Sequence, residues 1–502
     1  MTVGQLEPYK INFYFVNLTK SKLTNTTLTM PPLVDRRAEL RAINDRRARS
    51  SSFALVYGQR RTGKTFLLQH AFDGASDLVY FMADESTAAS LLGRLWADLG
   101  AAGRAPDGPV PGDWATALTL VAQQATLEGR PLTLVFDECQ YLIDAEPALP
   151  SVLQRIWDQH RHRMPLHLVL CGSALGVLEQ LGDVAQPLHG RFDLKLKLRA
   201  FDYADAAGFV PGWRPVDQLR LYGIFGGLAR HLAEVDAALP LADNVQRAIL
   251  DPHAPLHDAA PELLRRERLS SRAEAYAVLA AVAAGEYTFG AIAARAGING
   301  NRADYVIKEL LDLEILERVG RWGDREGSRY TRYRCADPFT RFWFRFVAPN
   351  RSALHSAGPA RVWYERVAPR LDDHMGAIFE QVARQAALAG VLGPHVGSID
   401  EAAPWWSRDG RTEIDLILRA GREVLAVECK WRGHGEVDLR ALRQLRDHVS
   451  RHPTLGGDPD LRLCLYSAGT FAPALRQVAD AEGVLLVGPD ALLPPPETSS
   501  SL

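Results

Sequence analysis

A stretch of eight residues between an apolar strand and a helix constrains this chain more than any other feature. It follows the apolar run 53–57, precedes the helical run 66–68, and is Gly58-Gln59-Arg60-Arg61-Thr62-Gly63-Lys64-Thr65. This is the full G-x-x-x-x-G-K-[ST] pattern in the strand–helix context that a phosphate-binding loop requires. Its glycines let backbone N–H groups turn toward phosphates, and the helix N-terminus adds a positive dipole end. We therefore expect Lys64 to reach the β- and γ-phosphates of a nucleotide and Thr65 to ligate Mg²⁺.

Polar residues at the ends of two further apolar strands predict the rest of this site. The run 132–136 ends in Asp137-Glu138, where Asp137 fits the acid that holds Mg²⁺ and Glu138 fits the base that orients the attacking water. The run 166–171 ends in Gly172-Ser173, and Ser173 is either a sensor of the γ-phosphate or an ordinary turn serine. Arg191 precedes the strand-like run 192–198 and is either a phosphate-sensing or finger arginine or a solvated surface residue.

These stretches resemble the archaeal-type ATPases, a P-loop family within the broad STAND/AAA-like group. The motifs that carry the resemblance are Gly58-x-Arg60-Arg61-x-Gly63-Lys64-Thr65, Asp137-Glu138-x-Gln140-Tyr141-Leu142, Cys171-Gly172-Ser173, Pro187-Leu188-x-Gly190-Arg191 and Tyr222-x-x-Phe225-Gly226-Gly227. The resemblance implies ATP and Mg²⁺ as cofactors, an ATPase core over residues 32–200 with a parallel sheet, and a helical lid over 201–267. One departure is visible, because Ala229 and His231 stand where the family usually has proline and tyrosine.

A winged helix is predicted for residues 268–350. Three helical segments, 272–284, 288–296 and 302–314, precede a strand at 315–318 and the alternating run 329–334, which is the order of a helix-turn-helix followed by a hairpin. Between Arg318 and Arg345 there are eight arginines and three acidic residues. This local excess favours DNA contact by the hairpin. Winged helices also mediate protein contacts, so that alternative stays open.

The segment after this hairpin resembles a junction of the same ATPase family. Its motif is Asp337-Pro338-Phe339-x-Arg341-Phe342-Trp343-Phe344, and in the family such a junction precedes a C-terminal domain of unassigned function. We interpret its clustered aromatic residues as packing residues and residues 351–370 as a connector.

A second set of charged residues lies in a predicted C-terminal hairpin. Asp415 is on its first strand, and Glu428 and Lys430 share one face of the returning strand because they are two residues apart. The two carboxylates, with Glu380 from a preceding helix, are suited to hold one or two Mg²⁺ ions that activate water, while Lys430 positions the nucleophile or offsets charge.

These positions resemble the PD-(D/E)XK nuclease superfamily over residues 371–490. The resemblance implies a restriction-endonuclease-like α/β domain and a metal-dependent nuclease site, with Gln444 as a further candidate member. The alternative is that Glu428 and Lys430 form only a structural salt bridge in an inactive domain.

Composition limits the class of protein. The chain has 502 residues, of which 47% are hydrophobic and 24% charged, so we expect a folded protein of three or four domains. Its longest apolar run, residues 275–284, is too short to span a membrane. The five cysteines lack metal-like spacing and the net charge is −2, which favours a cytoplasmic protein without a global basic field.

The two ends of the chain differ from the rest. Residues 1–31 form a leader that is disordered, is a targeting peptide, or precedes a true start at Met30, and residues 491–502 are expected to be a disordered tail. The oligomeric state stays open. We therefore expect an ATP-hydrolysing α/β P-loop protein coupled to a DNA-binding winged helix and a metal-dependent nuclease domain. The alternative is an ATP-driven regulatory switch whose nuclease-like domain is inactive.

Overall fold

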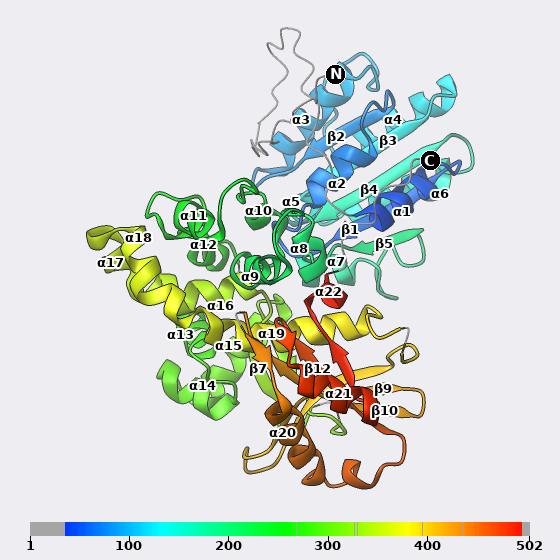
Figure 1. Ribbon diagram of the computed structural model, residues 1–502. Helices are drawn as coiled ribbons and strands as arrows, with labels where there is room; N and C mark the ends of the chain where they lie inside the picture. Colours follow the sequence, from blue (N-terminus) through cyan, green and yellow to red (C-terminus); the bar gives the residue numbers. More distant parts are fainter. Residues whose placement is uncertain are drawn as a thin grey trace, which may run out of the picture. The chain divides into compact units, whose positions relative to one another are not determined.

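The computed structural model describes residues 36–267, 269–325, 327–328, 330–393, 395–433 and 435–493. These residues divide into two compact units, with the boundary between residues 200 and 201, and Figure 1 shows their helices and strands. The predicted leader and residues 494–502 of the predicted tail lie outside the described residues. No helix of the described residues combines the length and the apolar character needed to span a membrane.

The first unit is built on a parallel sheet of five strands in the order β2-β3-β4-β1-β5. The strands are β1 (Ser52–Tyr57), β2 (Leu78–Met82), β3 (Leu132–Asp137), β4 (Leu166–Gly172) and β5 (Leu194–Lys197). The three central strands are buried along almost their whole length, which is why their sequences are continuous apolar runs rather than alternating ones. This confirms the predicted α/β fold with a parallel sheet.

Helices cover both faces of this sheet (Figure 1). They are α1 (Arg37–Arg47), α2 (Lys64–Ala71), α3 (Ala88–Ala101), α4 (Trp114–Glu128), α5 (Cys139–Ala145), α6 (Leu149–His160) and α7 (Leu175–Gln180). Side chains of α1 and α2 form one core with the sheet, and those of α3, α4 and α6 form the other. Because all five strands are parallel, their carboxyl ends share one edge, which is where the loop 58–63 and the pair Asp137-Glu138 lie.

The second unit begins with helices and continues into a three-helix segment with a hairpin. The first helices are α8 (Tyr203–Ala207), α9 (Pro215–Phe225), α10 (Ala229–Leu232), α11 (Leu241–Val245), η1 (Gln246–Leu250) and α12 (Ala259–Arg266). Next come α13 (Arg272–Ala283), α14 (Phe289–Ala296), α15 (Gly300–Asp312) and the antiparallel strands β6 (Leu316–Val319) and β7 (Arg332–Cys335). Side chains of Ser271, Thr288 and Asn299 accept hydrogen bonds from the first turns of α13, α14 and α15, which explains where these helices begin.

A helical segment connects this hairpin to the C-terminal sheet. It comprises α16 (Pro338–Phe342), η2 (Trp343–Val347), η3 (Ala348–Asn350), α17 (Arg351–Ala357), α18 (Pro359–Val362), η4 (Trp363–Val367), η5 (Ala368–Arg370) and α19 (Leu371–Leu388). Its aromatic residues are core residues, because Phe339, Phe342, Trp343 and Phe346 are all buried.

The C-terminal sheet is mixed and has the strand order β14-β12-β10-β9-β8. Its strands are β8 (Glu401–Trp406), β9 (Glu413–Ala420), β10 (Glu423–Lys430), β12 (Leu461–Ser467) and β14 (Leu485–Val487). Strands β8, β9 and β10 are antiparallel neighbours, whereas β10, β12 and β14 are parallel.

Helices lie on both sides of this sheet. One side packs against α19, and the other packs against α20 (Leu439–Ser450) and α21 (Pro473–Glu482). A short pair, β11 (Glu436–Val437) with β13 (Thr470–Phe471), η6 (Leu455–Gly457) and α22 (Pro489–Leu492) complete the unit. Helix α22 extends into the predicted tail.

Candidate nucleotide site and C-terminal carboxylate site

The loop between β1 and α2 has a backbone that requires glycine. Gly58 has φ 152°, and a Cβ atom there would lie 2.1 Å from the carbonyl oxygen of Leu198. Gly63 and Arg61 also have positive φ values, 93° and 71°. The Thr62 hydroxyl donates a hydrogen bond of 2.9 Å to the carbonyl of Gln59, which fixes the turn. The loop therefore has the glycine-dependent turn that its sequence predicts.

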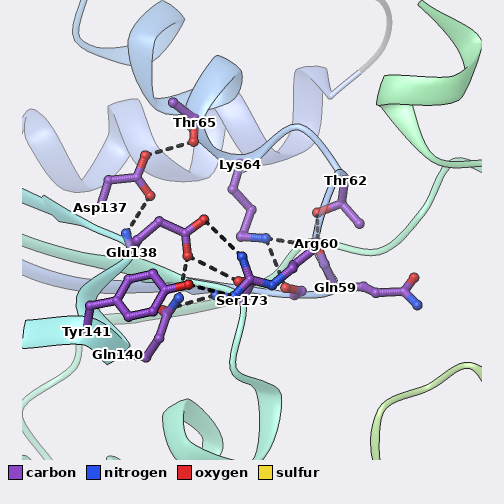
Figure 2. Close-up of polar contacts among 11 residues, drawn as sticks. Gln59, Arg60, Thr62, Lys64, Thr65, Asp137, Glu138, Gln140, Tyr141 and Ser173 are labelled. Carbon is purple, nitrogen blue, oxygen red and sulfur yellow. Dashed lines mark hydrogen bonds and ion pairs between the residues drawn. The ribbon is translucent and has the colours of Figure 1, made fainter. Parts of the chain in front are cut away.

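Lys64 lies inside this loop (Figure 2). Its Nζ donates hydrogen bonds of 2.9 Å to the carbonyls of both Gly58 and Gln59. Burial lowers the pKa of its ammonium group, while the carboxylates of Glu138 and Asp137 act in the opposite direction. A phosphate group in the loop offers this buried cation anionic acceptors in place of two neutral carbonyls.

The structure brings Thr65 and Asp137 together. The Thr65 hydroxyl donates a hydrogen bond of 2.7 Å to Asp137 Oδ2, and the backbone N–H of Glu138 donates one of 2.9 Å to Asp137 Oδ1. A hydroxyl and a carboxylate at this distance fit Mg²⁺, which prefers oxygen ligands and keeps several waters. Thr65 and Asp137 would hold the ion, whose charge would offset that of the phosphates.

Tyr80 is a neighbour of this pair that sequence reasoning missed. Its hydroxyl donates a hydrogen bond of 2.6 Å to Asp137 Oδ2, and burial followed by the Asp137 charge holds the pKa of Tyr80 well above its usual value. Tyr80 lies on β2, which pairs with β3. The available signal is the short strand pattern at 78–82, but only the strand order shows that this strand adjoins Asp137.

Glu138 is held by several polar side chains (Figure 2). Its Oε2 accepts a hydrogen bond of 3.1 Å from the Ser173 hydroxyl and another from Gln140 Nε2. Its Oε1 lies 4.0 Å from Nη1 of Arg60, which itself donates through Nη2 to the Tyr141 hydroxyl at 3.2 Å. The structure therefore places Ser173 beside the predicted base; its role as a sensor stays a prediction.

The lack of a side chain at Gly172 leaves room for the side chain of Gln140 next to Glu138. A Cβ atom at Gly172 would lie 2.2 Å from Gln140 Oε1. That oxygen also accepts a hydrogen bond of 3.4 Å from the backbone N–H of Ser173. Gln140 thus joins the end of β4 to the side chain of Glu138.

Arg191 is not part of this site. Its guanidinium pairs with Asp158 of α6, with Nη2 2.8 Å from Oδ2 and Nε 3.1 Å from Oδ1. The neighbouring Asp193 accepts a hydrogen bond of 2.9 Å from the backbone of Phe53, near the start of β1. Because the strands are parallel, this places Arg191 at the edge of the sheet opposite the loop. The structure therefore does not bring Arg191 to the loop 58–65 of the same chain, and its role as a phosphate-sensing or finger arginine stays a prediction.

The β9–β10 hairpin brings three predicted site residues close together, as expected from the sequence: Asp415 on β9, and Glu428 and Lys430 on β10. Asp415 Oδ2 accepts a hydrogen bond of 2.7 Å from the backbone N–H of Cys429. Lys430 Nζ donates to Glu428 Oε1, while Glu428 Oε2 is buried without a hydrogen-bond partner in the described residues. Burial raises the pKa of Asp415 well above its usual value, and the charges of Glu428 and then Glu380 add to the rise.

Only some of the residues predicted to bind a metal lie together in the structure. In the residues that the structure describes, no three His, Cys, Asp or Glu side chains are arranged as a metal site. Glu380 lies on α19, and burial followed by the charge of Glu413 raises its pKa to about 7. Gln444 is exposed on α20. Asp415 and Glu428, with the unpartnered Glu428 Oε2, are therefore the pair that fits a divalent cation best.

Carboxylates within the chain neutralise much of the predicted basic patch. Arg332 Nη1 lies 2.6 Å from Glu413 Oε1, and its guanidinium lies over the rings of Trp406 and Tyr287, 3.9 and 4.4 Å from their centroids. The remaining pairs are Arg334 with Glu317, Arg321 with Asp324, and Arg345 with Asp373. Arg329 and Glu326, which are part of the count, lie outside the described residues.

The loop of the same hairpin is anchored in the C-terminal sheet. Trp322 is buried in one core with Trp405. Its backbone N–H donates a hydrogen bond of 2.8 Å to the carbonyl of Pro404 on the edge strand β8. The guanidinium of Arg419 lies 5.1 Å from the centroid of its ring. The loop thus covers an edge strand that would otherwise expose unpaired backbone groups.

Two segments of the chain match known protein families. Residues 33–235 match a family described as an ATPase domain predominantly from Archaea. Residues 343–442 match a family described as archaeal and bacterial proteins of unknown function. Over 428 residues the chain is also 24% identical to an uncharacterized protein of Methanocaldococcus jannaschii, covering 85% of this chain and 93% of that protein.

Solved structures with a related arrangement include two archaeal proteins. The Walker-type ATPase PABY2304 of Pyrococcus abyssi has 18% identity and a TM-score of 0.46, covering 62% of this chain and 96% of that one. The ORC2 protein of Aeropyrum pernix in ADPNP–ADP complexes has 15% identity and a TM-score of 0.45, covering 66% and 98%. The family match over residues 33–235, together with the positions of Lys64, Thr65 and Asp137, supports a P-loop ATPase domain in that segment.

Proposed function

We propose that this protein binds and hydrolyses ATP in its first unit and cleaves nucleic-acid phosphodiesters in its second. The observation that carries the first part is the convergence of Lys64, the Thr65–Asp137 pair and Glu138 at the carboxyl edge of one parallel sheet. A parallel α/β sheet binds its ligands at this edge. The division into a core (32–200), a lid (201–267), a winged helix (268–350) and a nuclease-like domain (371–490) belongs to the same proposal.

Each residue of the first site has a distinct task in hydrolysis. The loop N–H groups and Lys64 bind the phosphates, and Thr65 and Asp137 are the residues that would hold Mg²⁺. Glu138 accepts a proton from water, whose oxygen attacks the γ-phosphorus as the bond to the β–γ bridging oxygen breaks, giving ADP and inorganic phosphate. Since Ser173 and Gln140 donate hydrogen bonds to its Oε2, Glu138 orients water through Oε1 or after Oε2 is released.

The second unit is proposed to act on nucleic acid for three reasons. Helix α19, strand β8, the β9–β10 hairpin and strand β12 follow the helix–strand–hairpin–strand order expected of the nuclease superfamily. Asp415 and Glu428 face a common region with Lys430, and Glu428 Oε2 has no partner in the described residues. Helices α13 to α15 followed by β6 and β7 have the order of a winged helix, which supports DNA as the partner. A bound divalent cation would activate water and stabilise the phosphorane-like transition state.

Paired substitutions test the two halves separately. Lys64→Ala should abolish ATP hydrolysis, whereas Asp415→Asn should abolish Mg²⁺- or Mn²⁺-dependent cleavage of DNA or RNA and leave ATP hydrolysis intact. The matched control is Asp409→Asn, which changes an exposed carboxylate in the loop between β8 and β9. Failure of the purified wild-type protein to cut single- or double-stranded DNA or RNA with metal and ATP would refute the nuclease half.

A second candidate function is an ATP-driven switch whose nuclease-like domain is inactive. The observation that favours it is the ion pair between Lys430 and Glu428, together with the absence of a three-ligand cluster in the described residues. In this case ATP hydrolysis persists, no substrate is cut, and nucleotide state changes partner binding or assembly. The same cleavage screen distinguishes the two functions, because only the first predicts a product that depends on Asp415.

A further inference from the structure

Asp137 is a buried carboxylate whose Oδ2 atom accepts hydrogen bonds from two hydroxyl groups. One comes from Thr65 on α2, at 2.7 Å, and the other comes from Tyr80 on β2, at 2.6 Å. The Oδ1 atom accepts a hydrogen bond of 2.9 Å from the backbone N–H of Glu138. Asp137 is only 1% exposed, and a carboxylate removed from water needs such donors or a cation beside it. Its orientation is therefore set from α2, from β2 and from the turn that precedes α5.

The strand register aims Tyr80 at this carboxylate. In the parallel pair of β2 and β3, Tyr80 lies opposite Val135, and Met82 lies opposite Asp137. Val135 and Asp137 are two residues apart and share a face of the sheet, and Tyr80 packs against the core on that face. A side chain as long as tyrosine is needed to reach along the strand from position 80 to Asp137 Oδ2. Phenylalanine at this position would fill nearly the same space but would lack the donor.

We propose that Tyr80 is a positioning residue of the nucleotide site, which holds Asp137 in the orientation that binds Mg²⁺. The inference rests on the proposed ATPase function, in which Thr65 and Asp137 hold the ion. Hydrogen bonds to a metal-binding carboxylate fix its orientation, and their removal lowers metal affinity or activity by about 10–100-fold in other metal sites. None of the motifs that predicted the nucleotide site includes Tyr80.

A purely structural role for the Tyr80 hydroxyl predicts a different result. In that case the hydroxyl only compensates for the burial of Asp137, and Tyr80→Phe lowers stability without a specific effect on metal binding. The chain offers a matched control for such a loss, because the hydroxyl of Thr133, near the amino end of β3, donates a hydrogen bond to Asp77. Thr133→Val also removes one hydroxyl–carboxylate hydrogen bond from this strand, but outside the nucleotide site.

The test measures ADP binding to the full-length protein by calorimetry, once in EDTA and once in excess Mg²⁺. ADP is the product of the proposed reaction, so the measurement does not depend on activity. Tyr80→Phe should bind ADP in EDTA as the wild type does, because the Tyr80 hydroxyl donates to Asp137 and not to the loop 58–63. In Mg²⁺ its ADP affinity should be lower than that of the wild type by about tenfold or more. Thr133→Val should bind ADP as the wild type does under both conditions, and thermal melts report the stability of all three proteins.

ATP hydrolysis gives a second signature that a structural defect would not produce. Tyr80→Phe should need about tenfold or more Mg²⁺ than the wild type for half of its maximal rate. Excess Mg²⁺ should then restore the rate, because the substitution weakens metal binding and leaves Glu138 in place. A rate that stays low at every Mg²⁺ concentration would count against a role in positioning the metal ligand.

The outcomes separate this inference from the proposed function. An equal loss of ADP affinity in EDTA and in Mg²⁺, or a full effect of Mg²⁺ in Tyr80→Phe, overturns the inference while the wild type can still hydrolyse ATP. A wild type whose ADP affinity does not depend on Mg²⁺ also overturns it. If Mg²⁺ strengthens ADP binding through Tyr80 but the wild type hydrolyses no ATP, the ATPase function fails and the positioning role of Tyr80 stands.

Discussion

Truncation of Trp322 to alanine should destabilise the second unit by roughly 3–5 kcal/mol. Trp322 comes from the loop between β6 and β7 but is only 7% exposed, in the same core as Trp405, Ile414 and Leu442. Removal of a buried tryptophan side chain costs about 3–5 kcal/mol when the surroundings cannot collapse into the cavity. The contact with the Arg419 guanidinium adds about 0.5–1 kcal/mol.

The assay is urea unfolding of the full-length protein followed by tryptophan fluorescence and circular dichroism. Because a chain of two units need not unfold in one step, the quantity compared is the midpoint of the transition that reports residues 201–493. Arg325→Ala, in the same loop but exposed, is the matched control and should change stability by no more than about 0.5 kcal/mol. ATP hydrolysis at 25 °C should be unchanged in both variants.

A small effect would refute this account of the hairpin. If Trp322→Ala shifts the midpoint no more than Arg325→Ala, the loop is not anchored in the C-terminal core. The contacts of Arg332 with Glu413 and Trp406 would then hold the hairpin against the C-terminal sheet without its loop.

Three further predictions follow from single positions. Gly58→Ala should abolish nucleotide binding measured by calorimetry, since its Cβ would lie 2.1 Å from a backbone oxygen that cannot move away easily; binding as in the wild type would contradict the loop geometry. Arg191→Ala should leave the ATPase rate within about twofold and lower stability by about 1–3 kcal/mol, because it removes a partly exposed pair with Asp158 and the hydrogen bonds of Arg191 to the carbonyls of Pro187 and His189; a large fall in rate would support its sensing role. Burial raises the pKa of Asp337 to about 7, so the folded state binds more protons than the unfolded state between pH 3.8 and 7. Stability should therefore fall as pH rises through that window, and Asp337→Asn should flatten this dependence in thermal melts at successive pH values; an equal slope in both proteins would rule Asp337 out as its source.

The nucleotide site could be predicted from the sequence because its parts are local motifs. The loop 58–65 is contiguous, and Asp137-Glu138 follows a strand whose apolar run marks it as central. In an all-parallel sheet both come to the same edge, so Lys64, Thr65, Asp137 and Glu138 meet without further information. Tyr80 could not be predicted, since its position depends on the neighbour that β2 takes in the sheet.

Two interpretations went beyond what local patterns can decide. Arg191 precedes a strand, so its place depends on which end of β5 faces the nucleotide, and the motif around it does not encode that. The excess of arginines between residues 318 and 345 was counted along the chain. The electrostatic potential at the protein surface also depends on the carboxylates of β6, β9 and α19 that pair with these arginines in the fold. The shared face of Glu428 and Lys430 could be predicted, because residues two apart on one strand point to the same side.

The most direct test of the central claim is ATP hydrolysis by Glu138→Gln, with ATP affinity measured on the same preparation. Glu138 lies beside the Thr65–Asp137 pair, and its carboxylate accepts hydrogen bonds from Gln140 and Ser173, whereas Lys64 donates to the loop carbonyls. We expect ATP affinity within about threefold of the wild type and a hydrolysis rate lower by about 10²–10⁴-fold, the contribution of a positioned general base. Hydrolysis by this variant at the wild-type rate would contradict the account.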